Sequence, residues 1–163
     1  MYLLLLTALA APPLMPAADV AEPGLQAWWK QGELLLGHPE QEGRPGLKPL
    51  VNLNPVVLPE DLAGWVRLGE SCVPRPESSR EVEGERLTAS VTASTEGPVV
   101  QVLSGERVVA QNALGRPAQV CEVLLAEADA IPGPEVIVAW RMELAGQADL
   151  RGITVFRVPE TAR

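Results

Sequence analysis

Histidine and cysteine are scarce in this sequence, and that scarcity excludes several kinds of catalytic and metal site. The 163 residues contain one histidine, His38, and two cysteines. A Ser-His-Asp or Cys-His catalyst needs a histidine base beside its nucleophile, whereas His38 precedes Pro39 in a proline-rich stretch where we expect a solvated loop. Two cysteines and one histidine cannot form a four-ligand zinc site without carboxylates. We therefore predict no metal site and no catalytic role for His38.

Motifs that bind cofactors are absent as well. The sequence has no phosphate-binding loop, Rossmann glycine set, H-E-x-x-H or S-x-x-K, each of which places particular groups around a phosphate, a metal or a nucleophile. The segment Gly69-Glu70-Ser71-Cys72-Val73 approaches a nucleophile elbow but lacks the second glycine. We predict that the protein needs no cofactor.

Clusters of basic residues are also missing. The chain has 21 acidic and 13 basic residues and a net charge of −8, and its basic residues are scattered singly. A nucleic-acid-binding surface gathers Lys and Arg on one face to neutralise phosphates, and an anionic membrane surface attracts clustered basic residues. We therefore predict that neither nucleic acid nor an anionic membrane is a partner.

No apolar run is long enough to span a bilayer, which takes about 20 residues. A shorter run, Met1–Ala11, has the length of a secretory h-region, and Ala8-Leu9-Ala10 forms a small-x-small cleavage pattern. A later cut near Ala17-Ala18 is an alternative. We predict a signal peptide within residues 1–18 and a secreted or periplasmic location. The competing interpretations are an ordinary N-terminal element of a cytosolic protein and a leader retained as a membrane anchor.

The two cysteines, Cys72 and Cys121, predict one disulfide, because an even cysteine count after an export leader is typical of an oxidised protein. In the chain-entropy model, closing a loop of about 50 residues stabilises a fold by roughly 4 kcal/mol. Two buried free thiols are the alternative.

Proline divides the chain. Nine of the sixteen prolines precede residue 60, and the stretch from His38 to Pro59 is too rich in them for a long helix or a central strand. Before it, Pro23–Glu33 predicts a short helix that carries Trp28 and Trp29. We therefore divide the sequence into the leader (1–18), a Trp-bearing helix with a proline-rich extended arm (19–59) and a β domain (60–163).

The β domain is predicted from period-two alternation of apolar and polar residues and from short spacers that contain Gly or Pro. The expected strands are Leu87–Ala93, Val99–Leu103, Arg107–Ala110, Val120–Leu125, Val136–Met142 and Ile153–Val158. Short connections favour antiparallel pairing. The predicted fold class is mainly β, a single antiparallel sandwich or barrel-like domain with the short N-terminal helix and the proline-rich arm. Trp65 and Trp140 are predicted core residues.

Two segments resemble a known family. Glu127–Val158 has an acidic turn, Pro134-Glu135 leading into an apolar strand that ends Ala139-Trp140-Arg141, a polar loop, and the final strand ITVFRV. This segment resembles a blade of the FG-GAP or VCBS type of β-propeller, and the Val99–Ala110 hairpin is similar to the opening of a neighbouring blade. The resemblance implies strands, hairpins and a binding or adhesive role. The D-x-D-x-D-G calcium loop of that family is reduced here to Asp129 alone.

The function predicted from the sequence is a non-enzymatic binding or structural domain of the cell envelope, with a protein or a glycan as its partner. Trp28 and Trp29 are the candidate binding residues, because adjacent indoles cannot both face one core from a short helix. Coverage of both by the proline-rich arm is the alternative. The rival function is a carboxylate-dependent hydrolase acting on envelope glycans, which needs two suitably spaced acids. The acids considered are Glu60, Asp61, Glu81, Glu83, Glu85 and Glu122.

Overall fold

The computed structural model describes residues 11–38, 56–58, 61–127, 133–146 and 149–162. Within these ranges the chain forms twelve strands and one short 3-10 helix. The strands are β1 (Met15–Pro23), β2 (Gln26–Lys30), β3 (Glu33–His38), β4 (Val56–Val57), β5 (Val66–Leu68), β6 (Glu77–Val82), β7 (Glu85–Thr92), β8 (Val99–Ser104), β9 (Arg107–Ala113), β10 (Gln119–Ala126), β11 (Glu135–Met142) and β12 (Leu150–Arg157). The helix is Glu160–Ala162.

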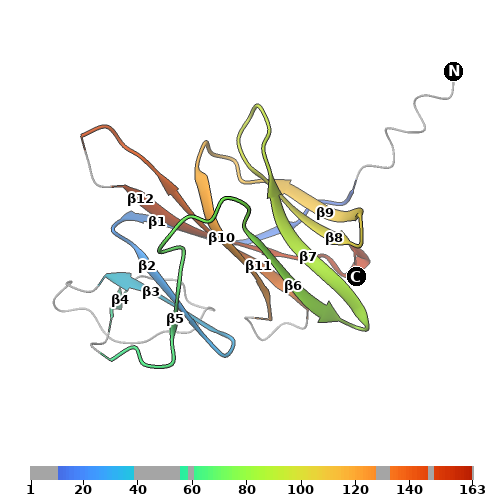
Figure 1. Cartoon of the computed structure of the whole chain (residues 1–163), viewed down its shortest axis with the longest axis horizontal. Coiled ribbons are helices and arrows are strands. Elements are labelled where there is room, and N and C mark those ends of the chain that lie inside the picture. Colours follow the sequence, from blue (N-terminus) through green and yellow to red (C-terminus); the bar gives the residue numbers. More distant parts are fainter. Residues whose placement is uncertain (1–10, 39–55, 59–60, 128–132, 147–148, 163) are drawn as a thin grey trace, which may run out of the picture.

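The strands form three four-stranded sheets. The central sheet has the order β1-β12-β11-β10 and is antiparallel. The two sheets that flank it are named here the inner sheet, which is the meander β6-β7-β8-β9, and the outer sheet, which has the order β4-β3-β2-β5. In the outer sheet, β4 pairs with β3 in parallel. Figure 1 shows the central sheet between the inner sheet on the right and the outer sheet at the lower left. The molecule is therefore a stack of three layers.

Strand β11 explains the three layers, because both of its faces are buried. Every residue from Glu135 to Trp140 is buried. Val136, Val138 and Trp140 belong to the core cluster shared with the inner sheet, whereas Ile137 and Ala139 belong to the cluster shared with the outer sheet. A near-continuous apolar run is what a strand covered on both sides requires.

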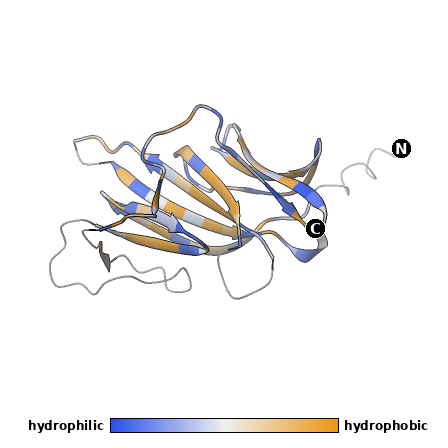
Figure 2. Cartoon of the chain, turned by 60° about the horizontal axis from the view of Figure 1, so that its bottom comes forward, coloured by the Kyte–Doolittle hydropathy of each residue, from blue (hydrophilic) through white to orange (hydrophobic). Residues whose placement is uncertain are grey.

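The core between the central and inner sheets contains the larger of these two clusters. The inner sheet contributes alternate residues, among them Leu87, Ala89, Val100 and Val102, all fully or nearly fully buried. Figure 2 shows hydrophobic residues running along the strands. The residue just before β1, Leu14, is also fully buried in this core.

The prediction of a short N-terminal helix over Pro23–Glu33 is wrong. This segment is a β-hairpin, in which Lys30 pairs with Glu33 across the turn residues Gln31 and Gly32. Both turn residues have positive φ, 43° and 85°, as in the type I′ turns that match the twist of paired strands. The strand then places the neighbouring indoles on opposite faces, which a helix could not do.

The mainly β prediction is confirmed, and the described ranges include all six of the strands expected after residue 60. The barrel-like alternative is wrong, because the described strands form three separate sheets, none of which closes on itself. The physical reason is that β11 carries apolar residues on both faces, so each face of the central sheet is covered by a separate sheet. Most of the proline-rich arm, residues 39–55 and residue 59, lies outside the described residues.

The outer sheet has a small core of its own on the side away from the central sheet. Leu35 and Leu58 are buried there, with Trp28, Leu62 and Trp65 packed against them. Trp65 is thus half-buried in an outer cluster, whereas Trp140 lies in the main core. In the part of the chain described by the structure, no helix has the length and apolar character needed to cross a membrane.

Candidate functional site

A pocket with polar groups at its rim lies where β1 meets β12 and the β9–β10 loop. Its volume is 380 Å³, within the range of roughly 300–1,000 Å³ that is usual for ligand pockets. We call it the β1–β12 pocket; it is lined by Pro16, Ala17, Ala18, Asp19, Ala113, Leu114, Arg116, Thr154 and Phe156. One wall is therefore four consecutive residues of the edge strand of the central sheet.

Four polar or aromatic side chains from four parts of the chain form a connected network at this pocket. The Trp140 Nε1–H donates to the Thr154 Oγ1 at 2.9 Å, and the Thr154 hydroxyl donates to the Asp19 Oδ1 at 2.7 Å. The Arg116 Nη2 donates to the other oxygen of Asp19 and makes an ion pair with it. Each carboxylate oxygen of Asp19 thus accepts a hydrogen bond, and the network fixes the carboxylate in one orientation.

Arg116 is also held by stacking. Its guanidinium lies 4.5 Å from the centroid of the Trp140 ring, within the distance at which a cation is attracted to an indole face. Because stacking and the ion pair act together, Arg116 has a defined position at the rim, where its side chain is 25% exposed.

Glycine at position 152 makes this arrangement possible. Gly152 is the cross-strand partner of Trp140, and a Cβ built on it would lie 2.0 Å from the indole Cζ2. Only a residue without a side chain leaves the indole room to lie across β12. Thr154 follows on the same face of β12, because side chains in a strand alternate, and there it meets the indole N–H.

The pocket is suited to binding rather than to hydrolysis by paired acids. Its lining holds one carboxylate, Asp19, beside the guanidinium of Arg116. Another cavity, of 350 Å³, has no charged residue in its lining of Pro74, Pro76, Val91, Thr92, Ala93, Ser94, Gly97, Pro98, Ala118 and Val120. Among the described residues no three His, Cys, Asp or Glu side chains are grouped so that they could hold a metal ion.

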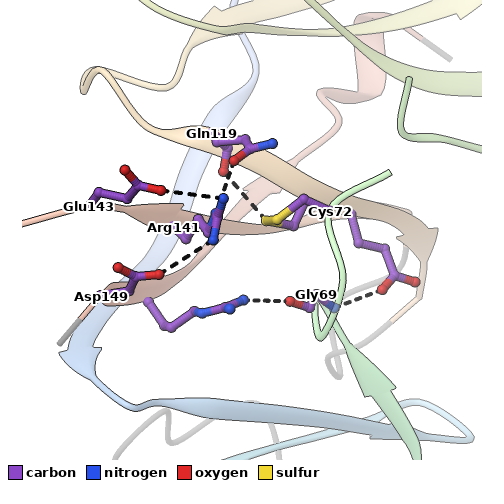
Figure 3. The surroundings of a disulfide bond; sticks show 9 residues. Gly69, Cys72, Gln119, Arg141, Glu143 and Asp149 are labelled. Atoms are coloured by element: carbon purple, nitrogen blue, oxygen red, sulfur yellow. Dashed lines mark hydrogen bonds and ion pairs between the residues drawn. A yellow bond between two sulfur atoms is a disulfide. The ribbon is translucent and has the colours of Figure 1, made fainter. Parts of the chain in front are cut away.

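A second feature, the segment that links the outer and inner sheets, is clamped to the central sheet. The predicted disulfide between Cys72 and Cys121 is confirmed, and Val73 N donates to Cys121 O at 3.2 Å. The amide of Gly69 donates to the Glu122 Oε1 at 2.8 Å (Figure 3). This clamp joins the outer layer covalently to β10.

Gly69 and Arg151 complete the clamp. The Arg151 Nη1 donates to the Gly69 carbonyl at 2.7 Å (Figure 3). Gly69 has φ of 70°, and a Cβ there would lie 2.7 Å from the Ala139 Cβ. The backbone therefore passes so close to the central sheet that only glycine fits.

Arginines gather near the clamp. Arg141 donates to Gln119 Oε1 at 2.9 Å and makes ion pairs with Asp149 at 3.4 Å and Glu143 at 3.6 Å (Figure 3). These acids offset the repulsion between Arg141 and its cross-strand neighbour Arg151.

Burial lowers the pKa of the Arg67 guanidinium, and the negative charge of Glu70 opposes this effect while Arg151 adds to it. Arg67 also lies over the Trp28 ring, 5.7 Å from its centroid. The two residues are cross-strand partners, so the guanidinium shares a face of the outer sheet with Trp28.

The candidate binding residues Trp28 and Trp29 lie on opposite faces of β2, so the two indoles do not form one site. Trp28 packs in the small outer core, and its Nε1–H donates to Gln26 Oε1 at 3.2 Å. Trp29 packs against the core between the outer and central sheets. Both are half-buried, and a role for them in binding stays a prediction. His38 ends β3, and its side chain lies outside the described residues.

Sequence reasoning missed Asp19, Arg116 and Thr154. The residues in contact are separated by 97 positions for Arg116 and Asp19 and by 135 for Thr154 and Asp19, and no local motif links them. The one local signal is Gly152 within an otherwise apolar strand, since glycine inside a strand often marks a close approach of another group.

Comparison of this chain with protein-family models, curated protein sequences and solved structures gives no match. The two segments that resemble propeller blades form the β8–β9 hairpin of the inner sheet and the β11–β12 hairpin of the central sheet. The family resemblance itself stays a prediction.

Proposed function

We propose that this protein is a non-enzymatic binding domain that works outside the cytoplasm and takes an extended peptide segment of a partner protein at the β1–β12 pocket. One observation carries this proposal: the wall of the pocket is the edge strand of the central sheet. Pocket and strand edge are therefore one continuous surface.

Strand β1 is suited to pairing with a further strand. It has nine residues, and in the described part of the chain it pairs only with β12. A peptide that adds to a sheet edge gains backbone hydrogen bonds, and alternate side chains of the peptide enter neighbouring pockets. The register irregularity between Pro16 and Ala18 bends the edge at the pocket. Pro16 and Pro23 lack N–H groups, which limits pairing to the residues between them.

The chemistry of the pocket favours an uncharged polar side chain. Asp19 supplies hydrogen-bond acceptors and Arg116 supplies several N–H donors, and together they carry no net charge. An amide or hydroxyl side chain, such as that of Asn, Gln, Ser or Thr, both donates and accepts and so matches this pair. Leu114 and Phe156 line the apolar part of the pocket.

A peptide is favoured over a glycan because the aromatic rings at the site are covered. Trp140 is 2% exposed and Phe156 is 3% exposed, so neither offers a ring face on which a sugar could stack. The rival hydrolase lacks support here, because glycoside cleavage takes two carboxyl groups about 5–10 Å apart and the lining contains one. The disulfide supports an oxidising compartment, and the leader predicted from the sequence of Met1–Ala11 is consistent with export.

Selection from a displayed library of random peptides tests the proposal. We expect the intact protein to enrich peptides with an extended, β-prone pattern and an Asn, Gln, Ser or Thr at one position. Ala17 and Ala21 are both exposed on β1, but only Ala17 lines the pocket. Ala17→Trp should therefore abolish capture of the selected peptides, and Ala21→Trp should weaken it much less.

Two results would overturn this function. Enrichment of no peptide family, together with binding to a glycan array that Ala17→Trp removes, would assign the pocket to sugars. Hydrolysis of envelope glycans that is lost in Asp19→Asn would establish the rival enzyme.

A further inference from the structure

A small cavity lies beside β5, the edge strand of the outer sheet, where that sheet meets β11 and β12 of the central sheet. Arg67 and Leu68 point to opposite faces of β5, because side chains in a strand alternate, and both line the cavity. The charged residues of the lining are Arg67 and Arg151, and its other residues are apolar or glycine. Two positively charged residues and no carboxylate thus line this space.

One donor of Arg67 has no acceptor. The Arg67 Nε is buried, and among the described residues it has no hydrogen-bond partner. A buried donor that stays unpaired is unfavourable, and more so when its group is charged. The contact of the guanidinium with the Trp28 ring, 5.7 Å from its centroid, holds the group in place without supplying an acceptor. The Nε is therefore available to an acceptor that enters the cavity.

Arg151 brings a second positive charge with donors to spare. Its Nη1 donates to the Gly69 carbonyl at 2.7 Å, and a guanidinium carries five N–H donors. Burial lowers the pKa of Arg67, the charge of Glu70 raises it, and the charge of Arg151 lowers it again. The two arginines therefore repel each other, and the exposed Glu70 offsets part of this effect from outside the lining. A negative charge inside the cavity would offset it more directly.

The size of the cavity limits what can enter. Its volume is about 10 Å³, close to what one water molecule takes up. Phosphate, sulfate and a peptide carboxylate each have several heavy atoms and are too large for it. A water molecule would accept from the Arg67 Nε but would leave the two positive charges as they are. A monatomic anion accepts from both arginines, and hydrogen bonds between ionised groups are the stronger kind.

We propose that this cavity binds a single halide ion, chloride under physiological conditions, between the Arg67 Nε and Arg151. The cavity and the clamp share Gly69 and Arg151, so a bound chloride joins β5 to β12 and strengthens the attachment of the outer layer. The inference stands apart from peptide binding, because this lining and that of the β1–β12 pocket have no residue in common.

The line width of the chlorine NMR signal of a sodium chloride solution tests the site, because chloride that exchanges with a protein site broadens the signal. The full chain should broaden it saturably. Sodium bromide should reverse the broadening, whereas sodium sulfate at the same ionic strength should not. Arg67→Gln should weaken chloride binding by about tenfold or more, since it removes a charge-assisted hydrogen bond. Arg141→Gln is the matched control, because Arg141 is the cross-strand neighbour of Arg151 but does not line the cavity; it should leave chloride binding unchanged.

A second variant keeps the test decisive if Arg67→Gln does not fold. Glu70→Gln removes an exposed carboxylate that acts on Arg67, and it should tighten chloride binding. Crystals grown with sodium bromide should show an anomalous peak within hydrogen-bond distance of the Arg67 Nε. Broadening that sulfate reverses as well as bromide does, or that Arg67→Gln and Arg141→Gln reduce equally, would assign the chloride to general surface charge and overturn the inference. A water molecule at this position, with no anomalous peak in the bromide crystals, would overturn it as well.

Discussion

The two faces of the central sheet are covered by different means. The inner sheet is held by a large apolar core, and its strands β6 to β9 follow one another in sequence. The outer sheet shares a smaller core with the central sheet. It is also tied to that sheet by the Cys72–Cys121 disulfide and by two hydrogen bonds of Gly69, whose N–H donates to Glu122 and whose carbonyl accepts from Arg151. The outer layer, whose apolar core is the smaller of the two, is therefore also joined by a covalent bond and hydrogen bonds.

This difference predicts that the inner interface contributes most of the global stability, whereas the clamp contributes to the stability of the outer layer. The following changes test that division, beginning with the largest expected effect.

Trp140→Ala should destabilise the whole protein by about 3–5 kcal/mol, since it empties a large site in the inner core. It also removes the N–H that donates to Thr154 and the ring on which Arg116 stacks. Denaturant unfolding measures the loss. Trp28→Ala is the matched control, and it should cost less because Trp28 is half-buried in the small outer core. Equal losses would contradict the division between the two interfaces.

Replacing Cys72 and Cys121 together by Ala should cost about 2–4 kcal/mol, because the bond joins residues 49 positions apart. Amide hydrogen exchange of the variant should be faster in β2, β3 and β5 than in the native protein. The strands β7 and β8 of the inner sheet should keep their protection. Loss of protection that is uniform across all three sheets would show that the outer layer is not a separate unit.

Gly152→Ala should cost about 1–3 kcal/mol through overpacking, because its Cβ would meet the Trp140 indole. The double variant Gly152→Ala, Trp140→Phe removes the colliding ring atoms. We expect the cost of the alanine to be smaller in that background, as a double-mutant cycle would show. Additive costs would mean that the indole does not determine the need for glycine.

Arg141→Ala should have the smallest effect, about 0–1 kcal/mol, because Arg141 and its acidic partners are partly exposed. Its ion pairs are screened by salt, so the difference from the native protein should shrink between low and high ionic strength in thermal unfolding. A loss above about 1 kcal/mol that salt does not reduce would contradict the small contribution expected of exposed ion pairs.

Much of the fold could be predicted from local patterns. Period-two alternation and Gly-containing spacers located the strands from Leu87 to Val158, because a half-buried strand and a tight turn each need only nearby residues. The pattern of Pro23–Glu33 does not distinguish helix from strand, since Leu and Trp are compatible with both in a short run. The local signal for a hairpin there is the turn pair Gln31-Gly32.

The candidate site could not be predicted, because it depends on contacts between distant residues. Asp19 looks like an ordinary exposed acid in sequence, and Arg116 looks like an ordinary loop residue. Only the pairing of β1 with β12 places Asp19 beside Thr154, and only the packing of the β9–β10 loop brings Arg116 over Trp140.

The sequence by itself determined a strand-rich chain with a pair of cysteines suited to one bond, because composition and short-range periodicity act within a few residues. The tertiary structure decided which strands share a sheet, that β11 is covered on both faces, and that Leu14 belongs to the core. Those features depend on which apolar faces meet, and that choice is made by the packing of the whole chain.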